Sequence, residues 1–168
     1  MPKLIRLQAD GSFGWAEDPY TVLADEDPAV AGDLIVSLKR FMAESEALLG
    51  SRRVGVRLEA GEAVEDLAYD LPRLSVVALA FPKFLDGRAY TSARLLRQRY
   101  GFAGEIRAVG DVLREQSLHM TRCGFDAFQP ADGTDPQAWG AAAHRYRHVY
   151  QRGADDREPA FVERGRAG

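Results

Sequence analysis

Residues 74–128 read LSVVALAFPKFLDGRAYTSARLLRQRYGFAGEIRAVGDVLREQSLHMTRCGFDAF, and this stretch decides the fold. Residues 74–81 are almost wholly apolar, which is typical of a strand that is covered on both faces. Ala89, Ala93 and Leu96 then recur at the spacing of one helix face. The pattern predicts a strand, a helix, a strand, a helix and a strand at residues 74–81, 86–100, 105–110, 111–124 and 125–129.

The residues before this stretch predict an N-terminal ribbon and a further strand–helix unit. Residues 3–8 are expected to form a strand, and residues 20–24 to pair back on it as a hairpin. An apolar stripe predicts a helix over residues 38–49. Residues 34–37 are either a strand before that helix or its first turn, and residues 53–58 are a short strand.

The residues after the stretch predict one more helix and a polar tail. Asp135-Pro136 is a strong helix start, because Asp caps the first turn and Pro fits into it. The inner stripe of this helix is expected to contain Trp139, Ala143, Tyr146 and Tyr150.

This order of elements predicts an α/β fold with a mainly parallel sheet. Parallel strands with short connections require right-handed crossovers. The sheet is then either open and doubly wound or a partial, TIM-barrel-like half-barrel, since the units number roughly half of the eight in a closed barrel. An exposed edge of a half-barrel is a place where a homodimer could form. We expect three parts: an N-terminal β-ribbon at 1–24, an α/β domain at 25–150, and a loosely packed polar tail at 151–168.

Composition excludes several classes of protein. A formal net charge of −3 and a pI near 5.7 argue against nucleic-acid binding, which needs a basic surface. No apolar run reaches the roughly 20 residues of a membrane helix, and the start lacks a secretion signal, so a cytoplasmic protein is expected. Cys123 is the single cysteine, which rules out an internal disulfide and a multi-cysteine zinc or iron–sulfur site.

The candidate site lies at the ends of the strands, where each strand is followed by a helix. Parallel α/β folds bind ligands at this edge of the sheet. Asp86 and Arg88 follow the strand at 74–81, and Arg107 and Asp111 lie in and just after the next strand. Two guanidinium groups at one rim suit a small anionic ligand such as a sulfur oxyanion, a phosphate or a carboxylate. The neighbouring hydroxyls of Tyr90 and Thr91 are additional donors, and Asp111 is the candidate general base.

A purely structural interpretation competes with this one. Asp86 and Asp111 can act as helix caps, and the arginines can pair with Asp111 and Glu105. Gln116 stands in an apolar helix stripe and is expected to hydrogen-bond a strand carbonyl or to reach the site.

Two further side-chain groups are expected to be inert. Cys123 falls on an inner helix stripe, which favours a buried, unreactive thiol over a redox role. His144 and His148 have the spacing of one helix face, but the neighbouring arginines favour a solvated helix face over a metal site.

A long motif in this region resembles a known family. The residues are Phe81-Pro82, Asp86–Arg97, Gly104–Val112 and Arg122–Ala127. They are similar to the signature of an uncharacterised bacterial domain-of-unknown-function family, whose members usually carry the label "oxidoreductase probably involved in sulfite reduction". Thr91 replaces the usual serine but keeps the hydroxyl, and Glu115 replaces the common aspartate but keeps the acid.

The resemblance implies an accessory protein, and in that label an oxidoreductase, of assimilatory sulfite reduction, with sulfite reductase as the partner. The cofactor is unknown, since no Gly-x-Gly-x-x-Gly fingerprint is present. Two alternatives stay open: a non-redox α/β enzyme acting on an anionic metabolite, and a non-catalytic interaction module for sulfite reductase.

Overall fold

The computed structural model describes residues 4–166. Residues 1–3 of the predicted ribbon and 167–168 of the predicted tail lie outside this range. The strands are β1 (Leu4–Leu7), β2 (Phe13–Ala16), β3 (Tyr20–Val22), β4 (Asp33–Ser37), β5 (Val54–Leu58), β6 (Val76–Phe81), β7 (Glu105–Gly110) and β8 (Ala127–Phe128). The helices are α1 (Leu38–Leu48), α2 (Arg88–Arg94), α3 (Ser117–Cys123), α4 (Pro136–Ala143) and α5 (Ala160–Arg166).

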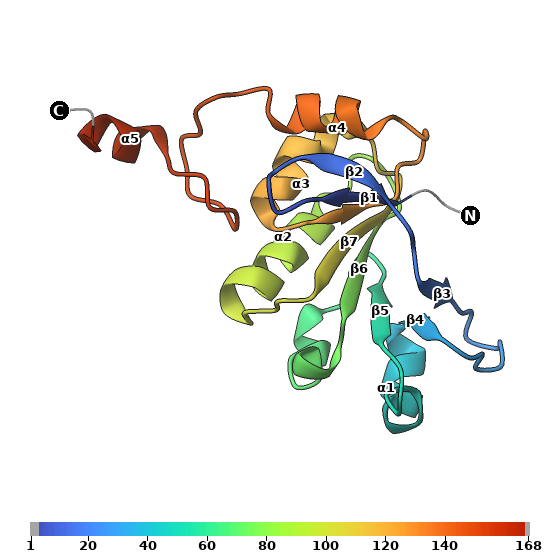
Figure 1. Cartoon of the computed structure of the whole chain (residues 1–168). Helices are drawn as coiled ribbons and strands as arrows, with labels where there is room; N and C mark the ends of the chain where they lie inside the picture. Colours follow the sequence, from blue (N-terminus) through green and yellow to red (C-terminus); the bar gives the residue numbers. More distant parts are fainter. Residues whose placement is uncertain (1–3, 167–168) are drawn as a thin grey trace.

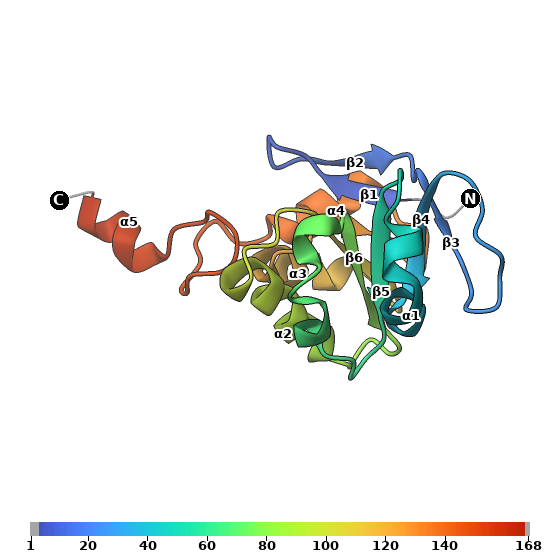
Figure 2. The ribbon, with the colours of Figure 1, turned by 90° about the horizontal axis from the view of Figure 1, so that it is seen from below.

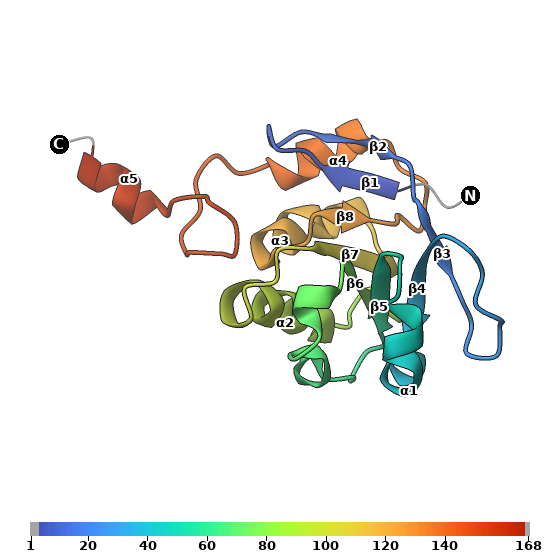
Figure 3. The ribbon, with the colours of Figure 1, turned by 60° about the horizontal axis from the view of Figure 1, so that its bottom comes forward.

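The eight strands form one sheet in the order β2-β1-β8-β7-β6-β5-β4-β3. Strands β3 to β8 are parallel, and β1 pairs antiparallel with both β8 and β2. Figure 3 shows the strands following one another round an arc from β2 to β3. The α/β prediction is therefore confirmed, and the half-barrel alternative is the one adopted.

The main core lies between the helices and one face of this sheet. Val77, Leu79 and Phe81 of β6 and Ile106 and Ala108 of β7 are buried on that face. They pack with apolar residues of α1, α2, α3 and α4 (Figures 1 and 2), among them Phe41, Ala93, Met120 and Trp139. Alternation along each strand leaves the other set of side chains on the inner face of the arc.

The inner face carries a row of side chains in register across five strands. The paired positions are Arg6, Ala127, Arg107, Ala78 and Arg57. Next to this row, Ala78, Ala80 and Val109 form a small buried apolar cluster separate from the main core. Arg107 therefore has its guanidinium on the side of the sheet that the helices do not cover.

The short connection between β2 and β3 explains why the sheet curls. These strands are the two outer strands of the sheet, yet only residues 17–19 link them. An extended chain from Ala16 to Tyr20 reaches about 15 Å, whereas a flat sheet of this width would separate its outer strands by about 34 Å. The link must therefore cross the open side of an arc, in front of the inner face.

The link is held there by a buried ionic cluster. Arg107 donates from Nη1 and Nη2 to the carboxylate of Asp18 at 2.7 and 3.1 Å, and from Nε to Glu105 at 2.7 Å. Glu105 also accepts from the guanidinium of Arg6 at 2.6 and 2.9 Å. Burial alone would lower the pKa of Arg107, but the hydrogen bonds that Arg107 donates to Asp18 and the charge of Glu105 outweigh it and raise the pKa.

Tyr20, the residue that follows the link 17–19, also binds to the sheet. Its hydroxyl donates to Ser75 Oγ at 3.0 Å, and its ring centre lies 5.6 Å from the guanidinium carbon of Arg107. The link 17–20 is therefore tied to the middle of the sheet through both a charged and an aromatic side chain.

The N-terminal prediction was wrong in its pairing. Residues 20–24 do not return to the first strand; β3 pairs with β4 at the opposite edge of the sheet. The partner of β1 is β2, joined through a turn in which Asp10 accepts hydrogen bonds from Ser12. Residues 34–37, left open between strand and helix, lie in β4.

The C-terminal prediction was partly wrong. Asp135 caps α4 by accepting from Gln137 N at 2.9 Å, as expected, but the helix ends at Ala143. Tyr146 and Tyr150 therefore do not continue its buried stripe and are exposed. The predicted loose tail contains α5, which projects away from the body in all three ribbon views (Figures 1–3).

We predict that Asp18→Ala lowers the free energy of unfolding by about 3 kcal/mol, because it leaves part of a buried guanidinium without its carboxylate. Urea denaturation followed by circular dichroism measures this loss. Asp156→Ala removes an exposed carboxylate and should change stability by less than about 0.5 kcal/mol. Equal effects of the two substitutions would mean that the link 17–19 is not held by this ion pair.

Candidate functional site

The carboxyl ends of β6 and β7 form the rim at which the sequence predicts an anion site. Two polar side chains join the loops that follow these strands. Asp111 accepts from Phe84 N at 2.8 Å. Gln116 accepts from Leu113 N at 2.9 Å and donates to Phe84 O and to the hydroxyl of Tyr90 at 3.3 and 3.2 Å. Asp111 and Gln116 thus fix the shape of the rim. Gln116 has the expected hydrogen bonds, but the carbonyl that it contacts, Phe84 O, belongs to the loop after β6 and not to a strand.

Asp86 and Arg88 lie at the exposed tip of the same rim. Arg88 donates from Nε and Nη2 to the two oxygens of Asp86 at 3.0 and 2.6 Å, and its backbone N–H also bonds Asp86. The bonds from Arg88 lower the pKa of the Asp86 carboxyl to about 2. Arg88 therefore already holds a carboxylate, and an anion at this place would compete with it.

Arg107 does not reach the rim, which corrects the predicted geometry. It points to the inner face of the sheet, it is fully buried, and Asp18 and Glu105 occupy its donors. The Arg88 and Arg107 guanidiniums do not meet at one mouth as predicted. Strand β7 directs the Arg107 side chain to the inner face of the sheet, opposite the face that the helices cover. Tyr90 is bonded to Gln116, and Thr91 is exposed on α2. Anion binding at Asp86, Arg88, Tyr90, Thr91 and Arg107 stays a prediction, and so does the role of Asp111 as general base.

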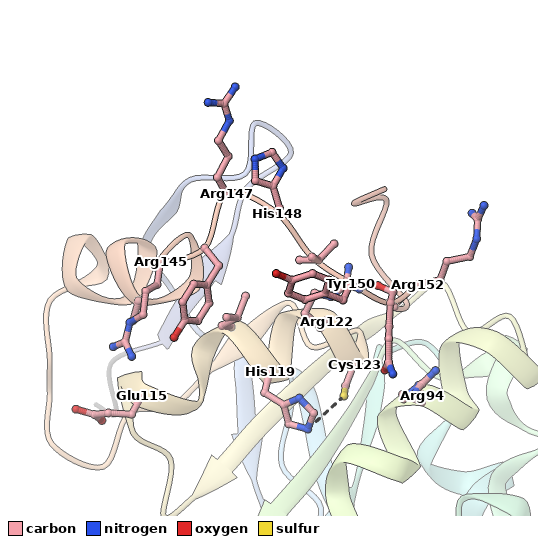
Figure 4. A pocket seen from close by; sticks show the side chains of 16 residues that line it. Arg94, Glu115, His119, Arg122, Cys123, Arg145, Arg147, His148, Tyr150 and Arg152 are labelled. Atoms are coloured by element: carbon pink, nitrogen blue, oxygen red, sulfur yellow. Dashed lines mark hydrogen bonds between the residues drawn. The ribbon is translucent and has the colours of Figure 1, made fainter. Parts of the chain in front are cut away.

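A groove elsewhere in the molecule has a stronger concentration of cationic groups. It lies between helices α2 and α3 and the C-terminal arm, by which we mean residues 144–166, and its volume is about 800 Å³. Arg94, His119 and Cys123 come from the helices, and Arg145, Tyr146 and Tyr150 come from the arm (Figure 4). We call it the arginine groove.

The arm is anchored across this groove by Arg122 of α3. The Arg122 guanidinium is bonded to the Asp155 carboxylate and to the carbonyl of Gln151, and Ala154 N donates to Arg122 O at 2.8 Å. Gln98 adds a bond to the carbonyl of Gly153 at 3.1 Å. These contacts hold the arm over the ends of α2 and α3.

The charge in the groove is one-sided. Its lining contains Arg94, Arg122, Arg145, Arg147 and Arg152 but one acid, Glu115, which is bonded to Arg114. Among residues 4–166, Arg122 has a carboxylate partner and the other four of these arginines have none. A chain with an overall charge of −3 therefore carries a local cationic surface, which attracts anions.

The floor of the groove is formed by His119 and Cys123 of α3. The Cys123 sulfur lies 4.0 Å from His119 Nε2, and the His119 ring packs on Tyr90 with the ring centres 4.4 Å apart. Partial burial, and then the charge of Arg94, lower the pKa of His119, so the imidazole is neutral at pH 7. Burial raises the pKa of the Cys123 thiol against the pull of the nearby arginines.

The groove is the feature that sequence reasoning missed. The signal was present in residues 144–152, HRYRHVYQR, where cationic and aromatic side chains alternate. We interpreted this run as a continuation of the helix, with His144 and His148 on a solvated face and Tyr146 and Tyr150 on the inner stripe, but the helix ends at Ala143 and the chain passes over α3 instead. A helical period was assumed where the backbone forms a turn and bends.

The histidines do not form a metal site together. His144 Nδ1 is 2.9 Å from Gly140 O at the end of α4, and His148 Nδ1 is 2.6 Å from Glu163 of α5. Within residues 4–166, no group of three or more His, Cys, Asp and Glu side chains has the arrangement of a metal site. In the same range, no helix is long and apolar enough to cross a membrane.

We predict that Cys123 in the native protein reacts with iodoacetamide at pH 8 at least about tenfold more slowly than a free cysteine, because it is buried and its pKa is raised. Mass spectrometry of timed samples measures the rate. Protein unfolded in urea is the control and should label at the rate of a free thiol. Native labelling as fast as in urea would contradict the inert assignment.

Comparison with known proteins gives one finding. No curated protein sequence matches the chain significantly. A family model described as "Bacterial protein of unknown function (DUF934)" matches residues 55–161, a range that includes the rim and the lining of the arginine groove but not the link 17–19. Since this match covers more than half of the chain, the protein belongs to the DUF934 family of bacterial proteins.

Proposed function

We propose that this protein is an anion-binding accessory protein of assimilatory sulfite reduction, and that its anion site is the arginine groove. The observation that carries the proposal is the set of four groove arginines without a carboxylate partner among residues 4–166: Arg94, Arg145, Arg147 and Arg152. A guanidinium group without a bound carboxylate is ready to bind an oxyanion through charge-assisted hydrogen bonds.

The rim of the half-barrel supports an anion site less well. Arg88 holds Asp86, Arg57 lies 2.7 Å from Glu59, and Arg107 is buried with Asp18 and Glu105. An anion at any of these guanidiniums must displace a carboxylate of the chain itself. Asp111, the candidate base, is bonded to a backbone N–H, which favours a structural role.

The pathway rests on the resemblance of the motif at residues 81–127 to proteins labelled as taking part in sulfite reduction. That role implies sulfite reductase as the partner and the cytoplasm as the compartment. The oxidoreductase part of the label would need a redox group other than the protein's own thiols, since Cys123 is the single cysteine and is buried. Binding of an anionic substrate or of an acidic surface of the reductase is the activity that the groove favours.

We predict that the double substitution of Arg94→Gln and Arg145→Gln weakens the binding of sulfite, sulfate and phosphate by at least about tenfold, because it removes at least one hydrogen bond from a charged group to the anion. Isothermal titration calorimetry measures the dissociation constants. Arg88→Gln at the rim is the matched control and should leave them unchanged.

Two results of this titration would count against the groove. If Arg88→Gln abolishes anion binding and the groove substitutions leave it normal, the anion site is at the rim and not in the groove. Absence of binding of all three anions to the parent protein would remove the anion-binding proposal altogether.

We also predict that a strain lacking the gene grows slowly or not at all with sulfate or sulfite as sulfur source and normally with cysteine. Growth curves on the three sulfur sources test this role without assuming a mechanism. A plasmid copy of the parent gene restores growth, and a copy encoding Arg94→Gln and Arg145→Gln does not. Equal growth of the deletion strain on all three sources would contradict the pathway assignment.

A further inference from the structure

We propose that the arginine groove takes a nucleoside phosphate, a ligand with a planar aromatic ring as well as anionic oxygens. This inference rests on the proposed anion-binding function of the groove and adds the chemical class of the ligand. The size of the groove, its aromatic side chains and the distribution of its charges all suit such a ligand.

The groove is far larger than an inorganic oxyanion requires. Its volume of about 800 Å³ lies within the roughly 300–1,000 Å³ of sites that bind cofactors and similar organic molecules. Apolar side chains, including Leu118, Ala142 and Val149, line part of it. A four-oxygen anion would leave these surfaces in water, whereas a ligand with an organic body would cover them.

Aromatic rings stand on both sides of the groove. Figure 4 shows the Tyr150 ring extending from the C-terminal arm over the floor, where His119 and Cys123 project from α3. Tyr150 and Tyr146 are 81% and 58% exposed, so their faces are available for a ligand. His119 is uncharged at pH 7 because its pKa is lowered, and a neutral imidazole is a good stacking surface for a base.

The arginines are placed at the ends of this ring-lined space. In Figure 4, Arg94 lies beside Cys123 at one end of the floor, and Arg145 lies at the other end, on the side of Glu115. Arg147 and Arg152 point outward from the arm and lengthen the cationic surface. A ring between Tyr150 and His119 would therefore have a guanidinium within reach of phosphate groups on either side.

The same ring-and-phosphate chemistry is present in single-stranded nucleic acid. A free nucleotide is the better fit, because the chain as a whole is acidic, whereas a surface for nucleic acid is usually strongly basic. The two sources are separated by including a single-stranded oligonucleotide among the probes.

The test compares three small probes with the parent protein by isothermal titration calorimetry: ADP, pyrophosphate and adenosine. ADP should bind roughly 5- to 100-fold more tightly than pyrophosphate, the range expected when one base stacks on an aromatic side chain. Adenosine, which lacks the phosphates, should bind more weakly than ADP. An oligonucleotide that binds more tightly per nucleotide than ADP would overturn the assignment to a free nucleotide.

Variants then assign the two parts of the ligand. Tyr150→Leu should reduce ADP affinity toward that of pyrophosphate, and Arg94→Gln should weaken ADP and pyrophosphate alike. Tyr69→Leu and Arg99→Gln are the matched controls, because Tyr69 is 90% exposed and both residues lie outside the arginine groove. Both controls should bind as the parent does.

Different results would contradict this inference and the proposed function. If ADP and pyrophosphate bind equally and Tyr150→Leu changes neither, the ligand is a simple anion and the ring assignment is wrong. If neither ADP nor pyrophosphate binds, the anion-binding function itself is wrong.

Discussion

The pairing of Asp18 with Arg107 is the interaction on which the rest of the structure depends. A three-residue link has to connect the two outer strands of an eight-stranded sheet, so the sheet curls and the link crosses its inner face. Arg107 meets the link there with a bidentate bond, and Glu105 and Arg6 complete the charge balance. A buried cluster of this kind requires every charge to be matched, which favours a structural role for Arg107.

The position of the link across the inner face also affects where ligands can bind. In a complete barrel the mouth at the carboxyl ends of the strands is the usual site. Here the link and its side chains lie across the inner face, and the arginines beside the mouth are paired with carboxylates. The four groove arginines without such partners come instead from α2 and the C-terminal arm, which Arg122 anchors beside α3. The arginine groove is thus an outer surface of the half-barrel.

The sequence predicted the elements whose signals are local. The apolar run of β6, the Asp135-Pro136 start of α4 and the end of α3 at Gly124, which has a φ of +104° that favours glycine, all follow from short-range rules. The β2 strand and the Asp18–Arg107 pair could not be predicted in this way. Asp18 and Arg107 are 89 positions apart, and a contact over that distance is created only by the order of strands in the sheet. The groove was missed for a related reason, since it needs the arm to leave the line of α4 after Ala143.

The central claim is that the anion-binding guanidiniums of this protein are those of the arginine groove. The most direct measurement is a titration of arginine-¹⁵N-labelled protein with pyrophosphate, followed through the assigned Nε–Hε resonances. We expect the resonances of Arg94 and Arg145 to move with a common binding curve and those of Arg88 and Arg107 to stay in place. Movement of Arg88 with stationary groove arginines would contradict this claim.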